Sequence, residues 1–320
     1  MRLPHFGSML FALMFSCSAM LQAQEYPSKA IRIVIPEPPG GGHDRVSRMV
    51  ADKLRDKWGQ AVIVETRTGA GGNIAAELVA NAAPDGYTVL FTPPGPLVVN
   101  KALYASLSFD PDNFVPVSRL TSAPSALLVH PRFTGDLRQF IAFAKANPDK
   151  LNYASSGNGT TQHLGAELLK SMADLKITHV PFKGQAPALL ALVSGQVDMM
   201  LANLGTTLPQ IRAGKMRALA VGSEKRSPVL PDVPALSEIL PGMSATTWSG
   251  MVAPAKTPEA IINKLSAAIG EIMKQPDIVK QLAESHTEAI GGSPAELAQV
   301  MKQERERWAG VIRSTGAKAD

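Results

Sequence analysis

Three glycine-rich segments combine small polar side chains with positions where a backbone can approach a ligand closely. They are residues 36–44 (Pro-Glu-Pro-Pro-Gly-Gly-Gly-His-Asp), 68–73 (Thr-Gly-Ala-Gly-Gly-Asn) and 155–161 (Ser-Ser-Gly-Asn-Gly-Thr-Thr). Glycine lets backbone N–H groups point at a ligand, and the N-terminus of a helix favours an anion. Each segment could be an ordinary turn between a strand and a helix, but three in one chain favour a carboxylate or phosphate site.

The sequence lacks the signatures of nucleotide binding, metal binding and hydrolysis. No G-x-x-x-x-G-K-[ST] or complete G-x-G-x-x-G pattern occurs, and H-E-x-x-H, C-x-x-C, G-x-S-x-G and S-x-x-K are absent. We interpret the histidines after residue 23 as hydrogen-bonded structural residues, although His43 and His163, which follow glycine loops, could contact a ligand. No nucleophile or acid–base pair can be assembled from spacing. We therefore expect a binding pocket with no catalytic residue, metal or cofactor, and no enzymatic activity.

The glycine segments follow β-rich runs that would place them at one edge of a sheet. Residues 31–35, 61–64 and 87–91 read as strands, and apolar residues at helical spacing predict helices over 46–54 and 74–82. This alternation predicts a parallel sheet covered by helices. In such sheets ligands bind at the carboxyl ends of the strands, where the loops meet helix N-termini.

The alternation restarts after residue 125 and predicts a second α/β unit. Strands are expected over 126–129, 151–154, 177–180, 197–201 and 217–221, and helices over 137–146, 161–172, 187–193 and 207–212. After the proline-rich stretch 227–241 the chain is expected to be mainly helical, over 259–273, 277–284 and 294–312. Two α/β units with a helical tail predict a two-lobed protein.

The N-terminus has the pattern of a secretory signal. Arg2 precedes the apolar run 9–15, and small residues lead to Ala23, after which cleavage is expected. The run is too short to span a bilayer, and Cys17, the only cysteine, lies within the signal segment 1–23. The mature chain would then contain no thiol and no disulfide, which suits a protein of the periplasm.

The composition excludes several classes of protein. Apolar residues make up 45% and charged residues 18%, which supports a sizeable core and argues against disorder. The formal net charge is +5, but the basic residues are scattered, whereas a nucleic-acid binder usually carries a basic stripe. We therefore expect no nucleic-acid partner.

Taken in order along the chain, these loops and their flanking motifs resemble the Bug-type substrate-binding proteins of tripartite tricarboxylate transporters. The resemblance covers nearly all of the chain after the signal. In the first half it is carried by residues 26–32 (Tyr-Pro-Ser-Lys-Ala-Ile-Arg), 38–41 with Asp44, 65–73 and 84–88. In the second half it is carried by residues 155–160, 163–164, 180–184, 195–198, 248–250, 253–254 and 257–258, and by Glu304 with Trp308.

The resemblance implies a type II periplasmic binding protein fold of class α/β, with two Rossmann-like lobes and a cleft between them. Residues 1–23 would be the signal peptide, 24–124 the first part of lobe 1, 125–226 lobe 2, and 227–320 a return segment with C-terminal helices that complete lobe 1. It further implies a monomeric periplasmic protein that captures a small mono- or dicarboxylate, aromatic or aliphatic. The partners would be the large and small membrane subunits of the transporter.

The family binds carboxylates mainly through backbone groups and small polar residues of these loops. The residues that this implies for lobe 1 are Glu37, Pro39, Gly40, Gly41, His43, Asp44, Gly71, Asn73 and Thr92. Those that it implies for lobe 2 are Ser155, Ser156, Asn158, Gly159, Thr160, Thr161, His163, Lys183, Gly184 and Asn203.

Two residues depart from the family pattern. Many relatives carry an aromatic or aliphatic residue in place of Glu37, and an acidic residue in place of Asn203. A neutral Asn203 removes a partner for an amino group, which favours plain carboxylates over amino acids. Glu37 would favour the opposite if it faced the pocket. Two alternative functions stay open: a ligand sensor that docks on a receptor, and an exported α/β enzyme.

Overall fold

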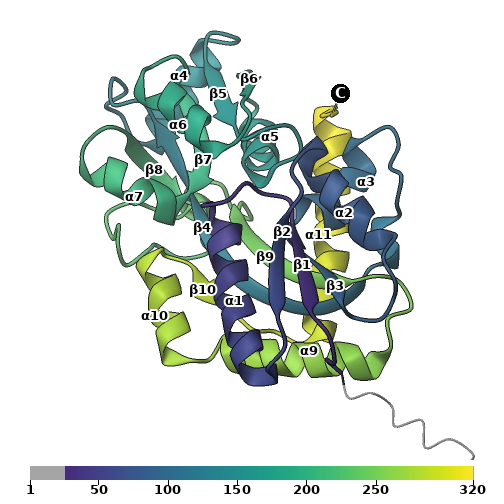
Figure 1. The fold of residues 1–320 in the computed structure, drawn as a ribbon. Helices are drawn as coiled ribbons and strands as arrows, with labels where there is room; N and C mark the ends of the chain where they lie inside the picture. Colours follow the sequence, from purple (N-terminus) through teal and green to yellow (C-terminus); the bar gives the residue numbers. More distant parts are fainter. Residues whose placement is uncertain (1–25, 320) are drawn as a thin grey trace, which may run out of the picture.

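A computed structural model describes residues 26–319 of the chain, and the expected signal segment with Cys17 lies outside the described residues. The chain forms two lobes, each a sheet with helices on both faces (Figure 1). The strands are β1 (Ile31–Ile35), β2 (Val62–Thr66), β3 (Thr88–Thr92), β4 (Val115–Val129), β5 (Asn152–Ser155), β6 (Thr178–Pro181), β7 (Met199–Asn203), β8 (Arg217–Val221), β9 (Thr246–Ala253) and β10 (Glu288–Ala289). The helices are α1 (Gly42–Trp58), α2 (Asn73–Ala80), α3 (Asn100–Leu103), α4 (Leu137–Ala146), α5 (Thr161–Ala173), α6 (Gln185–Val193), α7 (Leu204–Arg212), α8 (Leu236–Ile239), α9 (Glu259–Ile272), α10 (Pro276–Glu284) and α11 (Pro294–Thr315).

The long strand β4 belongs to both sheets. Its first part, Val115–Pro124, pairs with β9 in the order β2-β1-β3-β9-β4, which we call the sheet of the proximal lobe. Its second part, Ser125–Val129, pairs with β7 and β8, and β7-β5-β6 completes the sheet of the distal lobe. One continuous strand therefore joins the two lobes.

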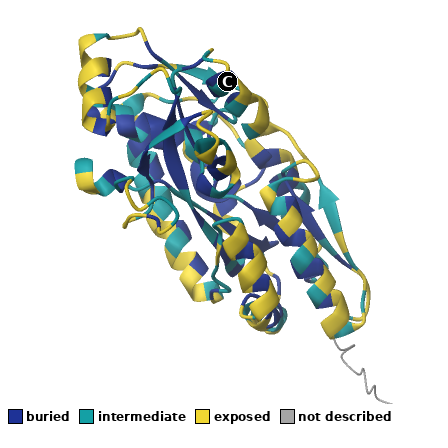
Figure 2. Ribbon diagram, turned by 90° about the vertical axis from the view of Figure 1, so that its left-hand side faces the viewer, coloured by how far each residue is buried: buried dark blue, intermediate teal, exposed yellow. Residues whose placement is uncertain are grey.

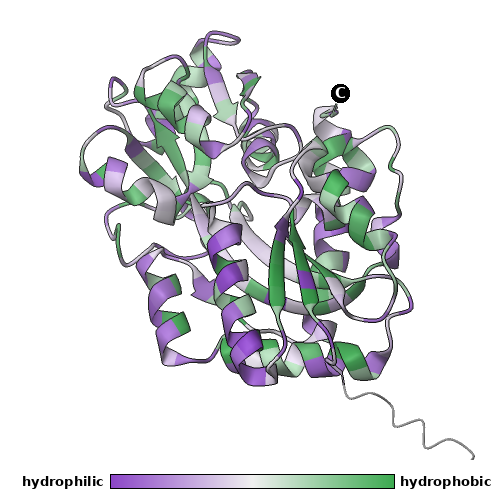
Figure 3. Cartoon of the chain, viewed as in Figure 1, coloured by the Kyte–Doolittle hydropathy of each residue, from purple (hydrophilic) through white to green (hydrophobic). Residues whose placement is uncertain are grey.

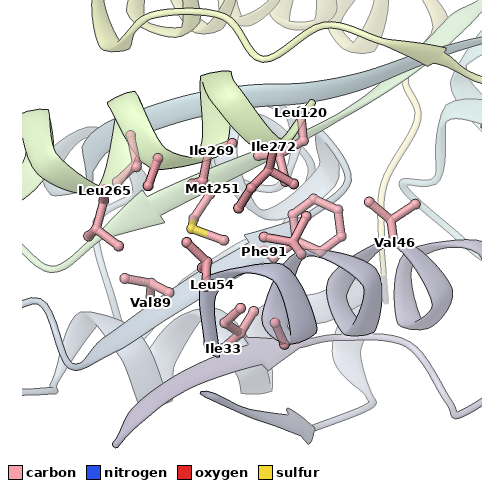
Figure 4. Packing of buried hydrophobic residues seen from close by; sticks show 14 of the residues in the cluster. Ile33, Val46, Leu54, Val89, Phe91, Leu120, Met251, Leu265, Ile269 and Ile272 are labelled. Atoms are coloured by element: carbon pink, nitrogen blue, oxygen red, sulfur yellow. The ribbon is translucent and has the colours of Figure 1, made fainter. Parts of the chain in front are cut away.

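The alternation of side chains along the proximal strands explains why helices cover both faces. On β3, Val89 and Phe91 face the cluster beneath α1 and α9, while Leu90 faces the cluster beneath α2 and α11. Figure 4 shows the first cluster, in which Phe91, Met251 and Leu54 meet side chains of α9. Parallel strands buried on both faces read as nearly continuous apolar runs, as β1 and β3 do. The edge strand β2 is more exposed, and its apolar residues share the hydrophobic colour of β1 in Figure 3.

The helices bury one side against the sheets and expose the other, as the striped colouring of Figure 2 shows. α11 begins with a capping box in which Ser293 and Glu296 bond each other's backbone N–H groups, and Pro294 occupies its first turn. It ends at Gly316, whose φ of 67° is the left-handed conformation that glycine adopts readily. Leu164 of α5 packs with Leu297 of α11 and Trp248, so a distal helix contacts the proximal core.

Two features differ from the expectation for the chain. The proximal sheet is mixed, because β9 runs antiparallel to both β3 and β4. β9 itself was not expected, since Thr246–Ala253 lies in a stretch predicted to be mainly helical. Val229, Leu236 and Met243, which precede β9, pack in the distal clusters.

Over residues 26–319, no helix has both the length and the apolar character needed to cross a membrane.

Candidate functional site

Five strands end in loops that lead directly into helices, as the sequence predicts for a ligand site. β1, β2, β5, β6 and β7 lead to α1, α2, α5, α6 and α7 respectively. α1, α2 and α6 begin after glycines, which have no side chain to cap them. The first N–H groups of α2 and α6 are free of side-chain bonds, whereas the His43 N–H of α1 bonds Glu37. α5 and α7 are capped by Thr160 and Asn203, each at the third helical N–H.

The distal glycine loop uses most of its own donors to fix its shape. The Ser155 hydroxyl and the N–H of Gly157 are hydrogen-bonded at 3.1 Å, and the Thr160 hydroxyl donates to the Gly157 carbonyl at 2.8 Å. The N–H of Gly159 donates to Nδ1 of His163 at 3.1 Å. The backbone N–H groups of Thr161 and Gln162, at the start of α5, bond no described residue. These two are among the donors that the loop leaves for a ligand.

Two histidines, the buried His163 and the half-buried His179, support this loop. The rings of His163 and His179 stack at 4.2 Å, and His179 stacks on Tyr153 at 4.7 Å. His179 Nε2 lies 2.7 Å from the Ser155 hydroxyl. Because His163 Nδ1 accepts the Gly159 N–H, its ring must be neutral with the proton on Nε2. The two rings thereby hold both ends of the loop.

The same burial makes these histidines resist protonation. It lowers the pKa of His179 to about 3, with His163 and Lys170 adding to the effect. Burial also lowers the pKa of His163, which Glu167 opposes and Lys170 assists. In the unfolded chain both would titrate near 6.5. The unfolded state therefore binds more protons below that pH, so the stability that the neutral rings contribute is lost as the pH falls from about 6.5 towards about 3.

We expect a His179→Gln variant to lose less stability than the wild type on acidification. Within that pH range, each histidine with a lowered pKa reduces the free energy of unfolding by at most about 1.4 kcal/mol for each unit that the pH falls. Urea unfolding at pH 7, 6 and 5 measures the difference between the two proteins. The comparison must be with the wild type, because His43, whose pKa is raised, changes stability with the opposite sign. Parallel losses in both proteins would contradict the prediction.

In the proximal lobe, Asp44 shapes the first glycine loop. Its buried carboxylate accepts the N–H of Gly40 at 2.8 Å and Nε of Arg48 at 2.9 Å. The Arg48 guanidinium, helped by the Gly40 N–H, outweighs burial and holds the pKa of Asp44 below its usual range. Asp44 is therefore engaged within the protein, and its role is to fold the loop over α1.

Asn100, the first residue of α3, holds the second glycine-rich segment, residues 68–73. Its Nδ2 donates to Oδ1 of Asn73 at 2.6 Å and to the Gly71 carbonyl at 3.2 Å. Its Oδ1 is buried and has no partner among the described residues. The Thr92 hydroxyl is also buried and donates to the Pro93 carbonyl at 3.1 Å.

A chain of hydrogen bonds links the starts of the three distal helices. The Ser156 hydroxyl donates to Gln162, whose Nε2 donates to Oε1 of Gln185 at 2.9 Å. Gln185 in turn donates to the Thr206 hydroxyl, and the Thr206 N–H donates to Asn203 at 3.3 Å. We call these five residues the polar belt. All its members are neutral, so the distal wall offers dipoles and no formal charge.

A cavity of about 380 Å³ lies where the two lobes meet. Gly42, His43 and Arg45 of α1 line it from the proximal lobe, and Asn203 and Thr206 from the distal lobe. Its remaining walls are Val46, Met49, Thr121, Ala123, Thr247, Trp248, Ser249, Gln281, Leu282, Glu284, Ser285 and Thr287. The Thr161 hydroxyl lies 3.5 Å from that of Thr247, which connects the start of α5 to this cavity.

Two glycines of the distal lobe lie close against the proximal lobe. A Cβ on Gly159 would lie 2.4 Å from Leu103 of α3, in the opposite lobe. A Cβ on Gly205 of α7 would lie 1.8 Å from the backbone carbonyl of Ser285, just after α10. Contact this close requires that both positions lack a side chain.

Of the expected site residues, His43 and Asn203 line the cavity, and the distal loop residues surround the start of α5. Glu37 forms an ion pair with His43, and Pro39 and Lys183 are exposed. The Gly184 N–H donates to the Ser156 carbonyl at 3.3 Å. Sequence reasoning missed Asn100, Gln162 and Thr206. Of these, only Gln162, in the first turn after a glycine loop, had a local signal.

The chain matches the family model described as "Tripartite tricarboxylate transporter family receptor" over residues 46–317. It is 39% identical to a UPF0065 protein of Pseudomonas sp. (strain P51), covering 94% of this chain and 90% of that protein. It is 34% identical to BugT of Bordetella pertussis, covering 97% and 96%.

Solved structures share the whole fold. An R. palustris protein determined with adipate superimposes with a TM-score of 0.84 at 33% identity, covering 92% of this chain and 99% of that one. MatC of Rhodopseudomonas palustris with bound malate gives 0.81 at 36%, covering 90% and 100%. The periplasmic binding protein BugD gives 0.82 at 31%, covering 92% and 100%.

Proposed function

Since this chain belongs to the tripartite tricarboxylate transporter family of receptors, which are periplasmic solute-binding proteins, we propose that it captures a small organic carboxylate between its lobes. We further propose that it is exported to the periplasm and delivers this ligand, as a monomer, to the large and small membrane subunits of such a transporter. Related proteins have been solved with adipate and malate, both carboxylates.

One observation carries the proposal: the start of α5 leaves the N–H groups of Thr161 and Gln162 without a partner, beside a cavity between two lobes. Free N–H groups and the positive end of a helix favour an anion. The polar belt surrounds this helix start with neutral hydroxyl and amide groups, so no negative side chain of the belt repels an anion there. Nothing in the cavity wall pairs a nucleophile with a base, which favours binding over catalysis.

The mature chain, from residue 24, can be tested by a thermal-shift screen against a library of organic acids. A ligand present at about 100 times its Kd should stabilise the protein by about 2.7 kcal/mol. Because the site lies between the lobes, a stabilising acid should also make the molecule more compact in small-angle scattering whenever the free protein is open. A library in which no carboxylate raises the melting temperature would contradict the proposal.

A further inference from the structure

Glu37 lies in the first glycine-rich segment, ahead of its glycines, and its carboxylate turns back over the start of α1. Oε1 lies 2.8 Å from Nδ1 of His43, a residue of the first helical turn. Oε2 lies 3.3 Å from the position that a Cβ on Gly41 would occupy. A carboxylate from the chain itself therefore lies against the glycine segment where the sequence predicts contact with a ligand.

Glu37 is ionised at neutral pH. Burial alone would raise the pKa of Glu37, but the ring and the backbone N–H of His43 together hold it below its usual range. Burial would likewise lower the pKa of His43, but Glu37 raises it instead. The other charged residues at the cavity, Arg45 of α1 and Glu284 of α10, contribute opposite charges. Glu37 thus carries its charge, and the His43 ring is already bonded to it.

The two lobes consequently differ in what they offer an anion. At the distal end, the N–H groups of Thr161 and Gln162 bond no described residue, and no carboxylate is hydrogen-bonded to them. At the proximal end, the α1 start faces Glu37, and the cavity-lining His43 is paired with it. A second carboxylate brought to α1 would meet a like charge, which is costly wherever water is scarce.

We propose that Glu37 occupies the proximal anion position and so makes this protein select ligands with a single carboxylate, bound at α5. The end of the ligand that faces α1 then carries an apolar group or a hydrogen-bond donor for Glu37. This inference rests on the proposed function, because it concerns the ligand of the same cleft.

The test compares acids of equal length that carry one or two carboxylates: hexanoate with adipate, and butyrate with succinate. Calorimetry at pH 7.5 gives the affinities for the wild type and for Glu37→Gln, which keeps the size of the side chain and removes its charge. We expect the wild type to bind the monocarboxylate of at least one pair about tenfold more tightly, and Glu37→Gln to tighten dicarboxylate binding about tenfold. The monocarboxylate affinity should change by less than about threefold, since its carboxylate lies at the other lobe.

Two further variants sharpen the result. Asp52→Asn removes an exposed negative charge from the same helix, away from the cavity, and should leave the selectivity unchanged. His43→Gln removes the imidazole that bonds Glu37 and should weaken dicarboxylate binding further. Binding with the same mono-to-dicarboxylate ratio in the wild type and Glu37→Gln would overturn the inference while leaving the proposed function intact. If none of these four acids, nor any carboxylate of the wider library, binds either protein, the proposed function falls and the inference with it.

Discussion

An alanine at position 205 should hold the two lobes apart. The added Cβ would lie 1.8 Å from the carbonyl oxygen of Ser285, a backbone atom that no side-chain rotation can move aside. Alanine is otherwise the better helix former by about 1 kcal/mol, so the distal lobe itself should not be weakened. We expect the Gly205→Ala variant to remain folded and to lose at least about 100-fold in ligand affinity, since closure brings both lobes to the ligand.

Calorimetry with the best acid from the screen, together with small-angle scattering, measures this effect. The matched control is Gly310→Ala in α11, where a Cβ has open space around it. It should raise the melting temperature slightly and leave binding unchanged. Wild-type affinity and wild-type compaction in the Gly205→Ala protein would show that the contact with Ser285 is not needed for closure.

A valine at position 159 should abolish binding by a different route. Gly159 is buried at φ +76°, a conformation that β-branched residues rarely adopt, and its Cβ would lie 2.4 Å from Leu103. Leu103 is only 3% exposed, so it has little room to yield. We expect both a strained distal loop, with the Gly159 N–H displaced from His163, and a blocked approach to the proximal lobe.

The backbone strain has to be separated from the loss of the site. Gly214→Val is the control, because Gly214 also has a positive φ, of 67°, but no atom lies within 4 Å of its Cβ position. Each substitution should cost roughly 1–3 kcal/mol in strain, measured by urea unfolding, and only Gly159→Val should lose the ligand. Retained binding by a folded Gly159→Val protein would place the anion site elsewhere.

The elements that form the lobes could be predicted wherever the pattern is local. β1 and β3 are apolar runs that end at turn residues, and α4 has helical periodicity over Leu137–Ala146, the range that the sequence predicts. β9 could not be found in this way. Thr246–Ala253 contains Gly250 and polar residues, and it forms a strand because β3 and β4 bond it from both sides. Of the fifteen residues of β4, the sequence predicted only 126–129 as a strand, and prolines at 116 and 124 obscured the remainder.

The site was predictable as a set of loops but not as a set of bonds. The glycine segments indicated where the backbone approaches a ligand. Their sequence did not reveal that the Gly159 N–H is given to His163, or that Asp44 is used to hold Gly40. The polar belt joins side chains of three separate helices, so no spacing along the chain could disclose it. Such pairings depend on tertiary structure.

The contact between Gly205 and Ser285 also limits the length of the ligand that the closed protein can hold. The backbone of Gly205 lies directly against the backbone of Ser285, so this contact limits how far the two lobes can close. A short acid cannot bring the two lobes closer than this contact allows, so water must fill the part of the cavity that the acid leaves empty. An acid too long for the cavity would keep the lobes apart and prevent the contact between Gly205 and Ser285. The closed conformation would then have the same outer shape for every ligand that fits the cavity, and a membrane component that recognises this shape would bind all of these complexes alike.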